Sequence, residues 1–332
     1  LMHVRADYPF DDVAVVSHHA NDGYSNPFSN YRKNYSGITG YPTCLVNYVY
    51  RLTGTYGTWQ ENYNWITTRV DVLLNQRAPG TLNIIYDDNG ATVDVHATFC
   101  LDEALTDNCS LWMLVYEDDV DGNGLLSQDG TTSPETVTIS DPGEYTTHDW
   151  SFTVDSGWDT DELNLVAFVQ KNTGDKAILQ VDIVHLYLDG TDDDAPQITG
   201  QYPADGQSDI PADTPLYFHL FDQTGVNTGT LDFSVSAPDL APQPRNNALR
   251  LGPRLPGEIS GTLDVDDTDP NHVICIFTPD ADLPLDTEIT CTVAGGLADT
   301  MGNSAAEESW IFEVASSAVV PSSWGAIKAL GE

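Results

Sequence analysis

Residues 272–314 read HVICIFTPDADLPLDTEITCTVAGGLADTMGNSAAEESWIFEV, and apolar and polar side chains alternate in three runs of this segment. The runs are HVICIF (272–277), TEITCTV (287–293) and WIFEV (310–314). Successive side chains of a strand point to opposite faces, so each run predicts a half-buried β-strand. Pro, Asp, Gly and Asn between the runs favour turns. The segment therefore predicts an all-β fold.

The same pattern extends toward the N-terminus as far as about Gln197, and LYFHLF (216–221) is a further strand candidate. We therefore expect one β-sandwich domain over residues 197–314, followed by a tail over residues 315–332. Residues 189–196, DGTDDDAP, have four carboxylates and no large apolar side chain, so they predict an acidic linker.

Residues 79–188 also favour a β-sandwich, because short alternating runs recur at regular spacing between turn residues. The predicted strands are Thr81–Tyr86, Ala91–Phe99, Ser110–Tyr116, Glu135–Ile139, Thr146–Val154, Leu163–Gln170 and Ala177–Leu188. The fold class expected for the whole chain is mainly β, with an α/β segment before this sandwich.

Residues 1–78 predict that α/β segment. Val13–Ser17 and the run from Pro42 to Tyr50 are strand candidates, and Asn26 precedes Pro27 as a helix N-cap does. Thr58 and Glu61 form a capping-box pattern before a second helix. An apolar stripe follows at spacings of three and four: Trp59, Tyr63, Ile66, Val70 and Leu73.

The composition excludes two classes of partner. The chain has 332 residues, with 51 acidic and 12 basic side chains and a net charge of −39. Nucleic acids and anionic membranes attract basic surfaces, so neither is an expected partner. A compact chain of this charge repels itself, and divalent cations would offset the repulsion. The alternative is that the acidic residues only keep an extracellular protein soluble.

Three segments resemble secreted bacterial proteins of the Omp28-related type: VAVVSHHANDGYSNPFSNYRKNYSGITGYPT (13–43), LWMLVYEDD (111–119) and LNLVAFVQKNTGDKAILQ (163–180). The resemblance implies that 1–78 is a truncated thioredoxin-like segment, with Pro42 at the family's often cis proline. It also implies that the family's CxxC half lies upstream of Leu1. The chain contains no CxxC pair, so we expect no thiol–disulfide activity.

A second resemblance covers most of residues 197–314. The segments YPADGQSDIPADTPLYFHLFD (202–222) and 273–314 are similar to bacterial Ig-like domains of the surface-layer type. The resemblance implies a domain that acts as a spacer, a display element or an assembly unit rather than as a catalyst.

One acidic segment matches the start of a calcium loop. Asp119, Asp121 and Asn123 stand at positions 1, 3 and 5, Gly124 stands at position 6, and Leu125 would offer a carbonyl at position 7. Position 12 is Gly130 where Glu is usual, and Asp129 is the nearest carboxylate. The preceding residues favour a strand, so we predict calcium in a loop between strands. The alternative is a polar turn.

Other polar clusters are weaker candidates. A second calcium loop is predicted on four carboxylates: Asp264, Asp266, Asp267 and Asp269. The alternative there is a solvated turn. Asp192–Asp194 in the linker could bind a bridging cation. For His18 and His19, next to Asp22, we favour one packed and one exposed imidazole over a transition-metal site.

The five cysteines predict two disulfides. Cys100 and Cys109 flank a short loop between strand candidates, and Cys275 and Cys291 lie in successive strand candidates. Cys44 is left over, and its apolar neighbours favour a buried, inert thiol.

The sequence contains no GxSxG, HExxH, P-loop or dinucleotide-binding motif, and it has no apolar run long enough for membrane insertion. We therefore expect a non-enzymatic structural protein, secreted to the cell surface or the extracellular space and stabilised by calcium. The N-terminal sheet, which lacks the family's first strand, would expose an edge and permit self-assembly into a filament or tube, so the expected partners are the chain itself or other cell-surface proteins. The alternatives are an accessory or carbohydrate-binding module of a secreted hydrolase, and a remnant of a thioredoxin-like redox protein.

Overall fold

The chain divides into two compact units, Leu1–Asp192 and Asp193–Glu332. The computed structural model describes residues 2–9, 13–20, 22–55, 57–118, 126–188, 192, 194–237 and 257–316. Most of the described secondary structure is β-strand, as the sequence predicted. The division falls inside the predicted acidic linker, and residues 1–78 and 79–188 belong to one unit. No helix in the described ranges is long and apolar enough to span a membrane.

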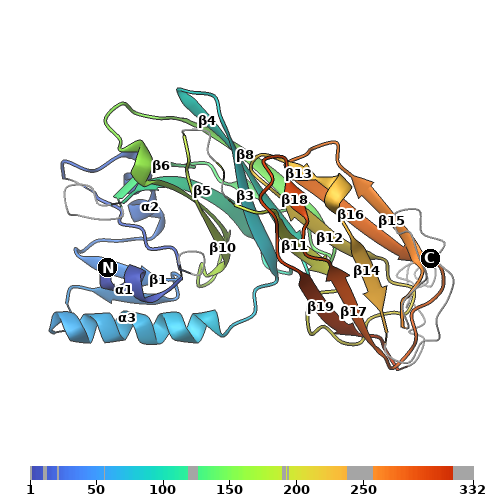
Figure 1. Ribbon diagram of the computed structural model, residues 1–332. Coiled ribbons are helices and arrows are strands. Elements are labelled where there is room, and N and C mark those ends of the chain that lie inside the picture. Colours follow the sequence, from blue (N-terminus) through green and yellow to red (C-terminus); the bar gives the residue numbers. More distant parts are fainter. Residues whose placement is uncertain are drawn as a thin grey trace, which may run out of the picture. The chain divides into compact units, whose positions relative to one another are not determined.

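The N-terminal unit is built on two antiparallel sheets (Figure 1). The three-stranded sheet has the order β3 (Gly80–Asp88), β4 (Thr92–Leu101), β8 (Tyr145–Thr153). The other sheet has the order β10 (Ile178–His185), β9 (Leu163–Lys171), β5 (Cys109–Glu117), β6 (Leu126–Gly130), and β7 (Glu135–Thr136) also pairs with β5. Alternate side chains of both sheets, such as Val95 and Val115, form the core. The predicted strands are confirmed, with the run over 135–139 shortened to two residues.

Every residue of β5 is buried, because its sheet is covered on both faces. Its odd-numbered side chains enter the core between the sheets, whereas Trp112, Leu114 and Tyr116 pack on the opposite face. On that second face they contact Val4 of α1 (Met2–Asp7) and Phe28 of α2 (Pro27–Tyr35). The N-terminal helical segment is therefore a layer over the outer face of the five-stranded sheet (Figure 1).

Both predicted helix starts are confirmed. The Asn26 side chain accepts a hydrogen bond from the Ser29 N–H at the start of α2. Thr58 and Glu61 form a reciprocal capping box at the start of α3 (Trp59–Leu74). Only Val70 of α3 is fully buried, and Trp59 is 66% exposed, so the predicted apolar stripe is only partly covered.

Of two strand predictions near the N-terminus, the one over residues 13–17 is wrong and the one from Pro42 is correct only for its first half. The run from Pro42 is a hairpin of β1 (Thr43–Val46) and β2 (Tyr50–Thr53), because Asn47 and Tyr48 turn the chain with positive φ angles. Residues 13–17 form a single bridge, from Ser17 to Leu126, instead of a strand. The Tyr41–Pro42 bond is cis.

The C-terminal unit is a second sandwich. One sheet has the order β11 (Gln197–Tyr202), β12 (Leu216–Phe221), β16 (His272–Pro279), β15 (Gly261–Asp266), and the other has the order β14 (Phe233–Ser236), β17 (Glu288–Val293), β19 (Glu308–Glu313). Phe218, Phe277 and Trp310 are among the side chains of its core. A short ladder of β13 (Val226–Asn227) and β18 (Ala298–Asp299) completes the unit.

Neither predicted disulfide is present: Cys100, Cys109, Cys275 and Cys291 are free and buried. Cys109 faces the core between the N-terminal sheets, whereas Cys100 alternates with the core residues Phe99 and Leu101 and points away from it. Cys275 and Cys291 face one core from opposite sheets. Burial raises the pKa of Cys100 to about 12 and that of Cys109 to about 11, so both thiols stay protonated at neutral pH.

Candidate functional site

The C-terminal unit buries two neighbouring carboxylates. Asp222 directly follows β12, and Asp299 ends β18. The β13–β18 ladder pairs Val226 with Asp299, and Thr300 donates its N–H to the Gly225 carbonyl at 2.8 Å. This pairing brings two loops that are distant in sequence side by side.

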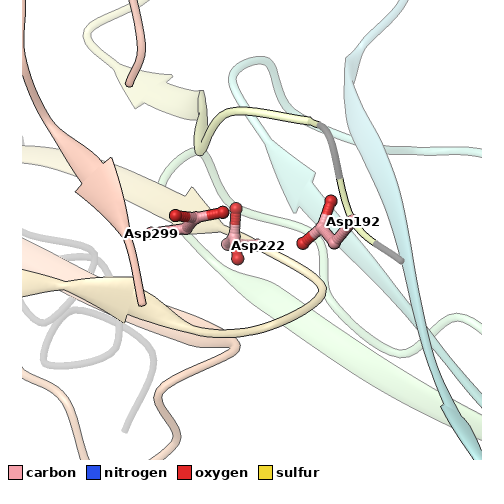
Figure 2. Close-up of side chains that lie close together, drawn as sticks. All are labelled: Asp192, Asp222 and Asp299. Carbon is pink, nitrogen blue, oxygen red and sulfur yellow. The ribbon is translucent and has the colours of Figure 1, made fainter. Parts of the chain in front are cut away.

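The two side chains are labelled in Figure 2, where the third labelled residue, Asp192, belongs to the N-terminal unit. Asp222 is 5% exposed and Asp299 is 2% exposed. One carboxylate oxygen of Asp222 lies within 4.8 Å of one carboxylate oxygen of Asp299. Two buried like charges at this separation need donors or a cation to offset their repulsion.

Hydrogen bonds supply part of that compensation. Asp222 Oδ1 accepts from the N–H groups of Thr224 and Gly225, both at 2.9 Å. Asp299 accepts from the Asn303 N–H and from its side-chain amide, both at 2.7 Å. The Thr224 hydroxyl lies 3.1 Å from Asp222 and 3.4 Å from Asp299, so it bridges the pair.

Asp299 remains ionised in this environment. Burial by itself raises the pKa of Asp299, but hydrogen bonds from Asn303, Gly302 and Met301 outweigh that effect and hold the pKa below its usual value. An anionic, oxygen-only donor set suits a hard cation such as calcium better than a transition metal.

Both residues of this pair lie in segments that carry the Ig-like resemblance. Asp299 lies in the segment LADTMGN, which carries part of the Ig-like resemblance, and Asp222 ends the quoted run LYFHLFD. Nothing in the local spacing relates the two positions. The β13–β18 ladder brings them together, and the pairing of distant strands cannot be predicted from a single sequence.

The first predicted calcium loop lies mostly outside the described residues, which exclude Asp119, Asp121, Asn123 and Leu125. Its last carboxylate, Asp129, is described and lies on β6 opposite Val115. Asp129 Oδ1 accepts a hydrogen bond from the Gly130 N–H at 2.8 Å. The end of the predicted loop is therefore a strand, and calcium binding there stays a prediction.

The second predicted loop is described throughout, and its carboxylates take separate partners. Asp264 and Asp266 lie on the exposed face of β15. Asp267 accepts from the Thr228 hydroxyl at 3.1 Å, and Asp269 accepts from the Asn271 N–H at 3.0 Å. Hydrogen bonds from the Thr268 hydroxyl and N–H hold the pKa of Asp266 below its usual value. Among the residues described, no three of these carboxylates converge on one point. Calcium binding here also stays a prediction.

The two adjacent histidines have different partners. His18 Nδ1 lies 2.9 Å from the Ser127 hydroxyl, and its ring packs edge-on against Phe28. Burial, together with the nearby Arg32 charge, lowers the pKa of His18 to about 3, so this imidazole is neutral. His19 lies 2.9 Å from Asp22 at the surface. The packed histidine of the favoured interpretation is His18, whereas His19 is only partly exposed, with 23% of its side chain accessible.

Comparisons with known proteins identify no family. No family model matches this sequence, and no curated protein matches it either. Among solved structures it is similar to a red sea bream transglutaminase, at 11% identity and a TM-score of 0.24 over 78% of this chain. The chain covers 34% of that transglutaminase, about one third of its length.

Two further solved structures are similar at the same low level. Dpr2 Ig1-Ig2 in complex with DIP-Theta Ig1-Ig3 is 11% identical, with a TM-score of 0.23, 70% of this chain covered and 99% of that chain. The B domain of a biofilm associated protein is 9% identical, with a TM-score of 0.24, 71% of this chain covered and 88% of that chain. Similarities of this size carry no argument about the activity of the chain.

Proposed function

We propose that this chain is a non-enzymatic extracellular structural protein whose C-terminal β-sandwich unit is stabilised by calcium. The observation that carries the proposal is the buried pair Asp222 and Asp299, in a chain with a net charge of −39. With one oxygen of each carboxylate within 4.8 Å of the other, the two charges repel by about 3 kcal/mol at an effective dielectric constant of 20. A divalent cation between the two carboxylates would convert this repulsion into attraction.

The overall charge supports the same proposal. With 51 acidic and 12 basic side chains, the chain has far more carboxylates than basic side chains. The ion pairs among the described residues are few, for example Lys171 with Asp107 and Arg77 with Glu103. Dissolved cations must therefore balance the remaining charge, and a bound divalent ion does so at the lowest cost in counterion entropy.

Self-assembly is the finer part of the proposal, and β15 is the edge that we assign to it. This strand ends its sheet in the described structure and exposes Thr262, Asp264 and Asp266 on one face. Carboxylates on an edge strand oppose pairing with a second copy, because two such edges repel. Calcium would remove that repulsion, so we expect assembly through this edge only when calcium is present.

Calcium-dependent unfolding tests the proposal. The protein is unfolded thermally in excess chelator, in millimolar magnesium and in millimolar calcium, each at equal ionic strength. If calcium reaches 100 times its dissociation constant, stabilisation of about 2.7 kcal/mol is expected. Calcium that stabilises no more than magnesium or sodium would refute the proposal.

Two variants locate the effect. Asp299→Asn and Asp222→Asn should each lose most of the calcium-dependent shift in unfolding temperature, whereas Asp282→Asn, which removes an exposed carboxylate, should retain it.

Light scattering and negative-stain microscopy of the same samples test assembly. Particles that form in calcium and dissolve in chelator support the structural role, and Asp264→Asn with Asp266→Asn should then permit association without calcium.

A further inference from the structure

The N-terminal unit buries a cation inside an aromatic cage. Arg32 of α2 is 2% exposed. Its guanidinium carbon lies close to the centroids of four rings: 4.3 Å from Trp112, 4.9 Å from Tyr48, 5.1 Å from Tyr35 and 5.1 Å from Phe168. Cation–π contacts of this kind offset part of the cost of removing the charge from water.

The hydrogen bonds of this cage are incomplete. Arg32 Nη2 donates to Gln170 Oε1 at 3.1 Å and also to the Tyr48 hydroxyl. Arg32 Nε and Nη1 are buried and have no acceptor among the described residues, and the same holds for Trp112 Nε1 and the Tyr35 hydroxyl. Buried polar groups are nearly always paired, so four unpaired groups around one charge require an explanation.

The charge of the cage is also unbalanced. No carboxylate of the described residues forms an ion pair with Arg32. A second cation lies beside it, because Lys176 Nζ is 3.9 Å from the centroid of Tyr35 and donates to the Tyr35 carbonyl at 2.9 Å. Burial lowers the pKa of Arg32, and its interactions with Tyr48 and Tyr35 oppose this effect only in part. Two cations thus flank one ring in a strongly acidic chain.

We propose that the cage around Arg32 is a binding site for a small monovalent anion of the halide class. All four unpaired groups can donate hydrogen bonds, and only the Tyr35 hydroxyl can also accept one. An anion accepts without having to donate, and it neutralises buried charge, whereas a water molecule must place its own two protons and neutralises nothing. Half-buried Lys176 lies where the cluster approaches solvent. The site is independent of the proposed calcium role.

Bromide is the probe for this site, because it substitutes for chloride and has an anomalous X-ray signal. Crystals of the full chain grown in bromide should show an anomalous peak within hydrogen-bond distance of Arg32 Nε or Nη1. The absence of an anomalous peak at this position, or density there that refines as water, would overturn the proposal. This measurement requires no variant.

A solution measurement uses thermal unfolding in sodium bromide and in sodium gluconate at equal ionic strength. We expect a saturable rise in Tm of about 4 to 10 °C in bromide, which is the range for a bound ligand in large excess. Arg32→Met should abolish the difference between the two salts. Arg69→Met is the matched control, because Arg69 also stacks on a ring, that of Trp65 at 3.9 Å, but is only half-buried. A bromide effect of equal size in Arg32→Met would contradict the proposal, and Lys176→Gln should weaken bromide binding several-fold.

Discussion

Gly130→Ala should destabilise the N-terminal unit, because the added methyl group has no space. A Cβ at this position would lie 2.7 to 2.8 Å from three ring carbons of Phe28. Ordinary carbon contacts are about 3.5 to 4.0 Å, so the ring or the strand must move by nearly 1 Å. Neither moves easily, since Phe28 is fully buried and Gly130 pairs with Leu114 on β5. Overpacking of this kind costs about 1 to 3 kcal/mol, which corresponds to a decrease in Tm of about 2 to 12 °C.

The assay is urea unfolding followed by tryptophan fluorescence, with Gly23→Ala as the control. A Cβ at Gly23 meets nothing within 4 Å, so this variant should unfold like the wild type. Phe28→Leu in the Gly130→Ala background removes ring atoms from the clash, so the double variant should lose less stability than the two single variants together. If Gly130→Ala is as stable as Gly23→Ala, or if the two changes are additive, the packing argument is wrong.

Two further predictions concern the N-terminal cap of α3 and the loss of stability of the C-terminal unit in acid. Thr58→Ala removes the capping box with Glu61 and should cost the N-terminal unit about 0.5 to 2 kcal/mol in urea unfolding, whereas Thr68→Ala on the exposed side of α3 should cost nothing measurable. Burial, together with the neighbouring His272, lowers the pKa of His219 to about 3, so below pH 6.5 the unfolded chain binds protons that the folded chain does not. The C-terminal unit should therefore lose about 2 kcal/mol through this group between pH 6.5 and pH 5, and His219→Gln should lose correspondingly less stability over the same range.

Local signals in the sequence predicted local structure correctly. Asn26 with Pro27, and Thr58 with Glu61, each fix a helix start within four residues, so no distant contact is needed to recognise them. The alternation of apolar and polar residues predicted β16, and a short apolar run predicted β9, because both patterns are also local. The strand β6 was missed because its residues, LSQDG, have little intrinsic β-propensity. It is a strand because the edge of β5 offers its backbone a hydrogen-bonding partner.

The contact between Gly130 and Phe28 explains why the predicted calcium loop departs from the usual pattern at its last position. Position 12 of a calcium loop normally supplies a Glu, and this chain has Gly130 there. The ring of Phe28 occupies the space that any side chain at this position would need. The sequence shows only that Glu is absent. The reason depends on the packing of α2 against β6, which a single sequence does not reveal.

The two polar clusters carry opposite charge, and this permits a decisive comparison of salts. Asp222 and Asp299 in the C-terminal unit would bind a cation, whereas Arg32 in the N-terminal unit would bind an anion. Calcium gluconate should therefore stabilise only the C-terminal unit, and sodium bromide at the same ionic strength only the N-terminal unit. Screening of the net charge of −39 would instead depend on ionic strength and would act on both units in either salt. Unit-specific responses would thus establish two bound ions, and parallel responses would reduce both effects to screening.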